Sequence, residues 1–120
     1  MHSNVIELAW AAGFFDGEGC VTYVDHAKTQ RTRAIRINIT QIHPEVLIRF
    51  QKAIGNLGSV LGPYSAKGRK TPLYTFQITN EKDVKLTFSL LQPYLSSIKK
   101  LQFEEKLHNW SQRTVKFRRI

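Results

Sequence analysis

The chain has 120 residues, a length typical of one domain covering residues 1–120, and 42% of them are hydrophobic, which is enough for a core. Its one cysteine, Cys20, excludes an intrachain disulfide framework and a cysteine-based zinc site. No signal peptide is recognisable, and no apolar run reaches the roughly 18 residues of a membrane span. We therefore expect a soluble intracellular protein without a membrane partner.

Positive charge dominates the chain and is concentrated in its middle. Eighteen lysines and arginines against nine acidic residues give a net charge of +9 at pH 7. Between residues 19 and 80, nine basic residues stand against only two acidic ones, Asp25 and Glu45. Such an excess favours an anionic partner, most often nucleic acid, and a generally basic protein is the plain alternative.

The first predicted element is a helix over about residues 5–16. Asn4, followed three residues later by Glu7, resembles a capping box in which Asn replaces the usual Ser or Thr. Ala9, Gly13 and Gly17 recur every four residues and so place small side chains on one face of this helix. Because small residues let two helix backbones approach closely, the stripe predicts a partner helix.

Two hairpins follow, each with alternating apolar and polar residues. The segments "GCVTYVDHA" and "RAIRINITQI" form the first, and "SVLGPYS" and "PLYTFQIT" form the second, around the basic turn "AKGRK". In the second strand Ile35, Ile37 and Ile39 alternate with polar residues. This period of two predicts an antiparallel sheet with one buried face and one wet face.

Three further helices complete the predicted order. Pro44 suits the first turn of a helix that "GNLG" ends, and Asn80 suits the N-cap of the next helix. After Pro93 a last helix covers about residues 97–112. The order α-β-β-α-β-β-α-α predicts an α+β fold whose exposed sheet face could read a DNA groove.

One motif points to a family. The stretch "AAGFFDGEG", residues 11–19, lies at the end of the first predicted helix and resembles the signature of the LAGLIDADG homing endonucleases. Residues 91–102, "LQPYL…KKLQ", are similar to the last segment of that family. The resemblance covers essentially the whole chain. It implies the αββαββα fold, with a four-stranded, saddle-shaped antiparallel sheet and the helices on one face.

The resemblance also implies an assembly, because this chain carries a single motif and single-motif members form homodimers. Two motif helices would then pack side by side on a two-fold axis. The residues expected at this interface are Ala9, Ala12, Gly13 and Asp16, and Asp16 is also expected to hydrogen-bond backbone groups. The implied function is a site-specific double-strand DNA endonuclease of intron or intein homing, which cuts a long near-palindromic target and leaves 3′ overhangs.

By the same resemblance, Glu18 is the metal ligand, assisted by the backbone carbonyl of Gly17. The implied cofactor is Mg²⁺; Mn²⁺ is also expected to support cutting, and Ca²⁺ to support binding only. Gln41 matches a polar residue that holds water near the metal. Lys99 matches a lysine that stabilises charge beside the scissile phosphate, although Lys100 is an alternative. Glu45 stands where some relatives carry a basic residue.

Residues of the wet sheet face and its loops are expected to contact double-stranded DNA. Arginine suits guanine and Asn or Gln suits adenine in the major groove, whereas Lys67 and Lys70 suit phosphates. The full set of candidates comprises Thr22, Val24, His26, Arg33, Arg36, Asn38, Ser65, Lys67, Arg69, Lys70, Thr75 and Gln77.

Two other readings remain open from the sequence. One is a non-catalytic or bifunctional relative that binds DNA or RNA, such as a maturase-type intron-splicing factor; RNA is a partner only in that case. The other is a basic α/β interaction protein in which the motif occurs by chance. As an endonuclease, the protein is expected in the cytoplasm or nucleoid of a prokaryote or in the interior of an organelle.

Overall fold

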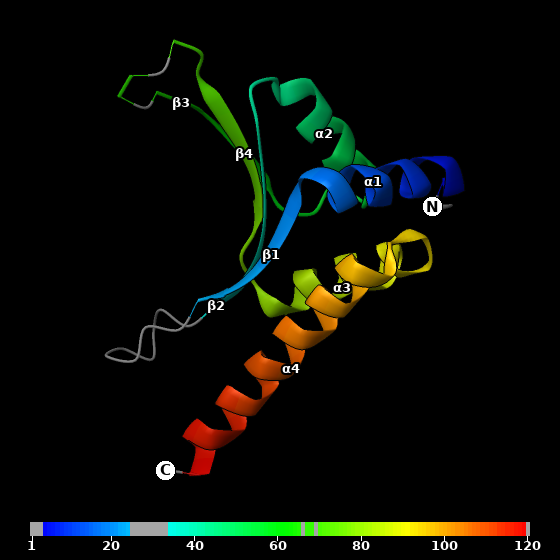
Figure 1. The fold of residues 1–120 in the computed structure, drawn as a ribbon, viewed down its shortest axis with the longest axis vertical. Coiled ribbons are helices and arrows are strands. Elements are labelled where there is room, and N and C mark those ends of the chain that lie inside the picture. Colours follow the sequence, from blue (N-terminus) through cyan, green and yellow to red (C-terminus); the bar gives the residue numbers. More distant parts are fainter. Residues whose placement is uncertain (1–3, 25–33, 66, 69, 120) are drawn as a thin grey trace.

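The computed structural model describes residues 4–119 except 25–33, 66 and 69. Its elements follow the predicted order (Figure 1). They are α1 (Val5–Glu18), β1 (Gly19–Val24), β2 (Ala34–Gln41), α2 (Pro44–Ala53), β3 (Ser59–Tyr64), β4 (Leu73–Ile78), α3 (Glu81–Leu91), the 3₁₀ turn η2 (Gln92–Tyr94) and α4 (Ser97–Arg119).

Helix α1 begins at its predicted residue and cap, but its capping hydrogen bonds and its C-terminal end differ from the prediction. The Asn4 Oδ1 atom accepts hydrogen bonds from the backbone N–H groups of Ile6, at 3.0 Å, and Glu7, at 3.3 Å. The reciprocal half of a capping box is not formed, because the Glu7 carboxylate pairs with Arg49 of α2 instead. The helix continues to Glu18, so both motif acids lie in its last turn.

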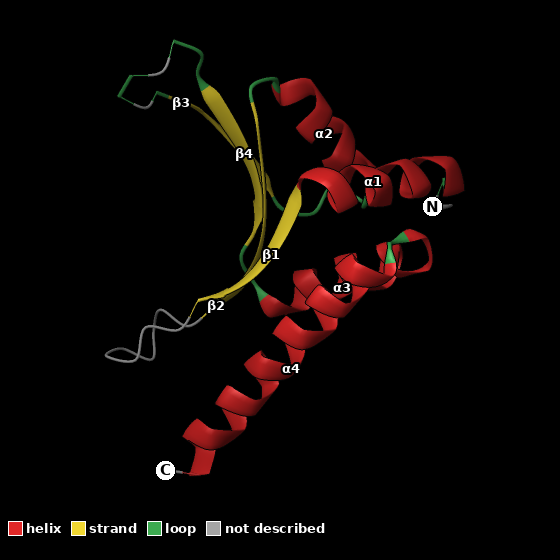
Figure 2. Ribbon diagram, viewed as in Figure 1, coloured by secondary structure: helices red, strands yellow, loops and turns green. Residues whose placement is uncertain are grey.

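The four strands form one antiparallel sheet in the order β1-β2-β4-β3. In the central pair, Ile37 lies opposite Ile78, and Ile39 lies opposite Phe76. All four of these side chains are buried on the side that carries the helices. Figure 2 shows every helix on this side of the curved sheet and none on the other. The prediction of an α+β fold with one covered and one open sheet face is thus confirmed.

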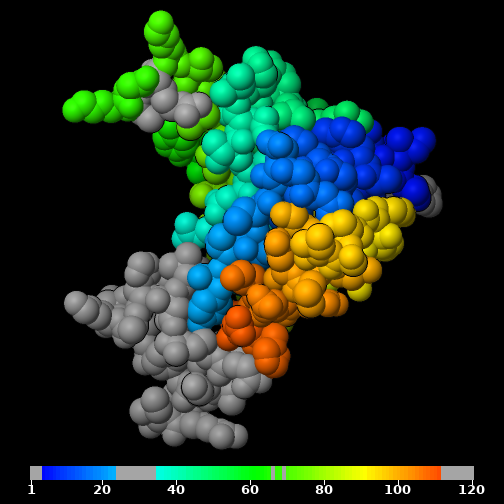
Figure 3. All heavy atoms as spheres, in the orientation of Figure 1, coloured from blue at the N-terminus to red at the C-terminus, as the bar shows by residue number. Residues whose placement is uncertain are grey.

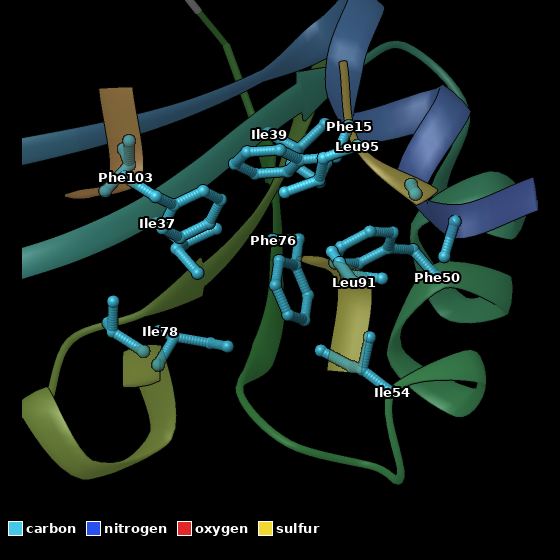
Figure 4. Packing of buried hydrophobic residues seen from close by; sticks show 14 of the residues in the cluster. Phe15, Ile37, Ile39, Phe50, Ile54, Phe76, Ile78, Leu91, Leu95 and Phe103 are labelled. Atoms are coloured by element: carbon cyan, nitrogen blue, oxygen red, sulfur yellow. The ribbon is translucent and has the colours of Figure 1, made fainter. Parts of the chain in front are cut away.

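Aromatic rings join the helices to the sheet in one core (Figure 4). The Phe50 ring of α2 lies 5.1 Å from that of Phe76 in β4, and the Phe15 ring of α1 lies 5.2 Å from that of Phe103 in α4. Each of these four rings has no exposed surface, so each is worth roughly 2–3 kcal/mol of hydrophobic burial. This packing fixes the end of α1 against the sheet and α4.

Helix α4 starts at the predicted residue but runs beyond the predicted end, to Arg119. Ser96 caps it, because the Lys99 N–H donates to the Ser96 Oγ at 3.2 Å. Further along, the Trp110 ring packs edge to face with that of Tyr23 in β1, with the ring centres 5.9 Å apart. No helix among the described residues is both long and apolar enough to cross a membrane.

Candidate functional site

The motif acid Glu18 lies where three elements meet. Gly19 pairs with Ile39, so the start of β1, directly after Glu18, lies beside the end of β2. There the Gln41 Nε2 atom donates a hydrogen bond of 2.6 Å to the Glu18 Oε1 atom. Glu18 is exposed and Gln41 is half-buried. The two residues, 23 positions apart in the chain, therefore share one polar site at the rim of the core.

Lys99 approaches the same site from α4. Its Nζ atom donates to the carbonyl oxygen of Gly19 at 2.9 Å and lies 5.6 Å from the centre of the Phe15 ring. The half-buried ammonium group therefore sits one residue beyond Glu18. The sequence left Lys99 and Lys100 as alternatives, and in the structure Lys99 is the lysine whose amine reaches the motif.

The other motif acid, Asp16, is bound within the chain. Its two carboxylate oxygens accept from the Ser96 N–H at 3.1 and 3.2 Å, and Oδ1 also accepts from the Ser96 hydroxyl at 3.0 Å. Because Ser96 caps α4, this contact ties the end of the motif helix to the start of the helix that carries Lys99. Figure 3 shows the start of α4, in yellow, directly against α1, in blue.

The expected dimer residues divide into two groups. Ala9 and Gly13 are exposed, as is Gly17, and a Cβ on Gly13 or Gly17 would meet no atom within 4 Å. The prediction for Ala12 is wrong, because Ala12 has no exposed surface and lies in the core of its own chain. The helical period explains this, since residue 12 points about 100° away from residue 13.

Gly19 has a different reason to be glycine. A Cβ at this position would overlap the ring of Phe15, which is fixed in the core. The backbone φ of Gly19 is −87°, which any residue adopts, so the constraint is close packing and not backbone strain. Of the three motif glycines, only Gly19 is explained by contacts within the described chain.

The donor chemistry fits one part of a Mg²⁺ site. No cluster of three or more His, Cys, Asp or Glu side chains occurs in the described residues. Glu18 supplies one exposed carboxylate, and the exposed Gly17 leaves open space around its backbone. Mg²⁺ in phosphoryl-transfer sites commonly takes one or two carboxylates and completes its shell with water and phosphate oxygens. Glu18 and Gly17 thus suit a site that substrate helps to complete.

The open sheet face carries the DNA-binding candidates that fall in described strands. Thr22 lies opposite Arg36, and Asn38 lies opposite Gln77. Thr75 shares this face and its hydroxyl lies 3.4 Å from that of Thr40. Three other candidates, Ser65, Lys67 and Lys70, are exposed beyond β3. The backbone of Val24 pairs with Ala34 in the sheet, but the structure does not describe its side chain. The remaining candidates, His26, Arg33 and Arg69, lie outside the described residues.

Three residues of the open sheet face, and the serine that binds Asp16, were not selected from the sequence. Cys20, Thr40 and Ser59 lie on the open face, and the alternation that selected Thr22 and Asn38 would also have found them. Ser96 was missed as an anchor of Asp16. Its signal is weak, because a serine before "SIKKLQ" indicates only a helix cap.

Comparison with known proteins identifies the family of the chain. The family model described as the LAGLIDADG-like domain matches residues 6–92, which include the motif of residues 11–19 and all four strands. The chain belongs to the LAGLIDADG family. Glu18 and Gln41 lie inside the matched segment, whereas Lys99 lies beyond it. The position of that lysine therefore rests on the structure.

Solved LAGLIDADG homing endonucleases share the fold. I-CvuI, solved in complex with the I-CreI target, superposes with a TM-score of 0.69 at 23% identity, over 89% of this chain and 67% of its own. The homing endonuclease I-TnaI superposes with a TM-score of 0.65 at 21% sequence identity, over 89% of this chain and 73% of its own. The meganuclease I-CpaMI, bound to uncleaved DNA, gives 0.66 at 17%, over 90% of this chain but 37% of its own. No curated protein sequence matches this chain.

Proposed function

We propose that this protein is a homodimeric homing endonuclease that cuts both strands of a long, near-palindromic DNA site in a reaction dependent on divalent metal. The observation that carries the proposal is the convergence of Glu18, Gln41 and Lys99 at the exposed end of the motif helix. An acid, an amide and an amine from three separate elements meet there, and hydrolysis of a phosphodiester needs such groups.

The roles of these residues combine the family resemblance with their contacts in the chain. Bound Mg²⁺ supplies charge neutralisation at the phosphate and an activated water. Glu18, with the carbonyl of Gly17, would hold the metal, and Gln41 would position the Glu18 carboxylate through its 2.6 Å hydrogen bond. Lys99 holds a positive charge next to the motif, where it stabilises the negative charge that develops on the phosphate.

The homodimer is supported by the surface of α1. Gly13 and Gly17 each cost a helix roughly 0.5–1 kcal/mol relative to Ala. Both are exposed with open space around them, so contacts within the described chain give no reason for glycine. Close approach of a second α1 supplies that reason. The chain also covers only 37% of the meganuclease I-CpaMI and 40% of I-SmaMI, as one of two units would.

Two copies related by a two-fold axis imply a symmetric target. Each Glu18 would act on one strand, and the cuts would leave 3′ overhangs. The open sheet face would lie in the major groove, with Lys67 and Lys70 on phosphates. I-CvuI and the archaeal intron-encoded I-Vdi141I, which share the fold, were solved as complexes with DNA.

A cleavage selection tests the proposal. The purified chain is incubated with a randomised duplex library in Mg²⁺ and the cut ends are sequenced, with Glu18→Gln as the matched variant. Parallel reactions use Mn²⁺, expected to support cutting, and Ca²⁺, expected to support binding only. We expect wild type to cut a long near-palindromic site that Glu18→Gln binds without cutting. Salt-sensitive binding without cutting by either protein would instead leave a DNA-binding relative and remove the nuclease.

A further inference from the structure

The strands that form the open sheet face are almost uncharged. Arg36 is the one charged residue in the four described strands, although the chain carries a net charge of +9. The lysines suited to phosphates, such as Lys67 and Lys70, lie in the exposed turn beyond β3. Because phosphate contacts add affinity and base contacts add specificity, the strands themselves are suited to reading bases.

Two amides lie side by side in the middle of this face. Asn38 of β2 is directly opposite Gln77 of β4 in the sheet register, with Cys20 and Ser59 in the outer strands of the same row. Neither amide has a hydrogen-bond partner in the described part of the chain, whereas the neighbouring Thr40 and Thr75 hydroxyls are 3.4 Å from each other. The two amides are thus available to a ligand, each with a donor and an acceptor.

Arg36 lies two residues before Asn38 on the same face of β2 and opposite Thr22. It is half-buried, and its Nε atom is buried without a hydrogen-bond partner among the described residues. Because the Nε atom has no exposed surface, only the rest of the half-exposed guanidinium group, with its two terminal amines, is open to an arriving base. Its planar fork matches the O6 and N7 atoms of guanine.

The direction of β2 gives the order of these groups along DNA. Gln41, at the end of β2, bonds to Glu18 and so marks the cutting end of the strand. At about 3.4 Å per residue, Asn38 lies about 10 Å and Arg36 about 17 Å from Gln41. Asn38 and Arg36 are therefore about 7 Å apart along the strand. This distance spans one or two base pairs, because the duplex rises about 3.4 Å per pair along its axis and the path along the helical groove is longer than that rise.

We propose that each half-site carries an A·T pair, read by Asn38 and Gln77, and a G·C pair, read by Arg36, one or two base pairs further from the cut. The inference rests on the proposed function and specifies its DNA target. It assigns Asn38, Gln77 and Arg36 as specificity-determining residues. It also fixes their order, with adenine on the side nearer to the cut.

The test is a binding selection on a randomised duplex library in Ca²⁺, so that its outcome does not depend on cutting. The full-length wild type is compared with Asn38→Ala, Gln77→Ala and Arg36→Lys, which keeps the charge but loses the fork. Each variant should lose a preference of about 10- to 100-fold at its own position and keep the rest of the site. Lys67→Ala is the matched control, and it should weaken binding to all sequences alike.

The outcomes separate the inference from the function on which it rests. A wild type that selects no duplex overturns both. If the wild type selects and cuts a palindromic site, two results overturn the inference alone. In the first, the variants leave the inner A·T and outer G·C preferences unchanged. In the second, the two preferences occur in the reverse order. Melting curves of the variants identify any loss of binding that comes from unfolding, and Arg36→Lys, which retains charge and bulk, then decides the Arg36 assignment.

Discussion

Gln41 and Glu18 are joined by the shortest hydrogen bond of the candidate site, 2.6 Å between Nε2 and Oε1. Gln41 continues the alternation of Ile35, Ile37 and Ile39, so it lies on the helix side of the sheet and not on the open side. That position lets it reach the end of α1. In the proposed mechanism Gln41 is a positioning residue, because it acts through the carboxylate of Glu18.

Replacing Gln41 should therefore lower the affinity of the site for Mg²⁺. Gln41→Ala leaves the Glu18 carboxylate unrestrained, and loss of such an outer partner costs about 10–100-fold in metal affinity or activity. Cleavage rates measured against Mg²⁺ concentration should show a higher midpoint, with DNA binding kept. The exposed Gln92 of η2 provides a matched control, Gln92→Ala. An unchanged Mg²⁺ midpoint in Gln41→Ala would show that the hydrogen bond has no role in metal use.

The two neighbouring lysines should behave differently. Lys99→Met removes the ammonium group that donates to Gly19 while keeping a chain of similar length along Phe15. Loss of one preorganised charged donor costs about 10²–10³-fold in rate, so cutting should fall by that factor while binding persists. Lys100→Met is the control and should keep the rate near that of wild type. Equal losses in the two variants would refute the assignment of Lys99.

Two glycine substitutions should separate assembly from folding. Gly13→Leu adds a side chain to open space and raises helix propensity, so the chain should still fold cooperatively while the dimer dissociates. Gly19→Ala should leave the dimer contact untouched but cost about 1–3 kcal/mol of stability, because its Cβ overlaps the Phe15 ring. Sedimentation and thermal melting measure the two effects. A dimeric Gly13→Leu protein would place the interface elsewhere.

The sequence predicted the elements because their signals are local. A capping Asn4, alternating apolar residues in the strands and a small-residue stripe each occur within a few positions, and the motif placed Glu18 at a helix end. It could not separate exposed Gly13 from buried Ala12 without the position of the core. Nor could it supply the contact between Asp16 and Ser96, residues 80 apart that only tertiary packing brings together.

That long-range contact should be measurable as a coupling. Asp16→Ala removes three hydrogen bonds to Ser96 and should cost about 1–3 kcal/mol, as bonds to a charged group do. Ser96→Ala should cost a similar amount, because it also removes the cap of α4. Urea unfolding of both single variants and the double variant gives the interaction energy. The double variant should lose clearly less than the sum, and strict additivity would show that the two residues are independent.

The pair formed by Glu7 and Arg49 should make stability depend on pH. The Arg49 guanidinium donates two hydrogen bonds, of 2.8 and 2.9 Å, to the Glu7 carboxylate and lies 3.9 Å from the centre of the Trp10 ring. The hydrogen bond from Arg49 is the main reason that the pKa of Glu7 falls below its ordinary value of 4.5; desolvation opposes it and the Arg49 charge adds to it. The pair joins α1 to α2.

Because the folded-state pKa of Glu7 lies below its unfolded-state pKa, the contribution is complete above the ordinary value and is lost as the pH falls through the lowered pKa. Melting temperatures of wild type and Glu7→Gln should therefore differ most above the ordinary pKa of 4.5 and converge as the pH falls through the lowered pKa. Glu81 also has a lowered pKa, from hydrogen bonds with Lys85 and Trp110, but it titrates in both proteins and cancels. Since the Glu7–Arg49 pair is solvent-exposed, 1 M salt should shrink the difference at every pH. A difference independent of both pH and salt would assign the effect of Glu7→Gln to packing and not to charge.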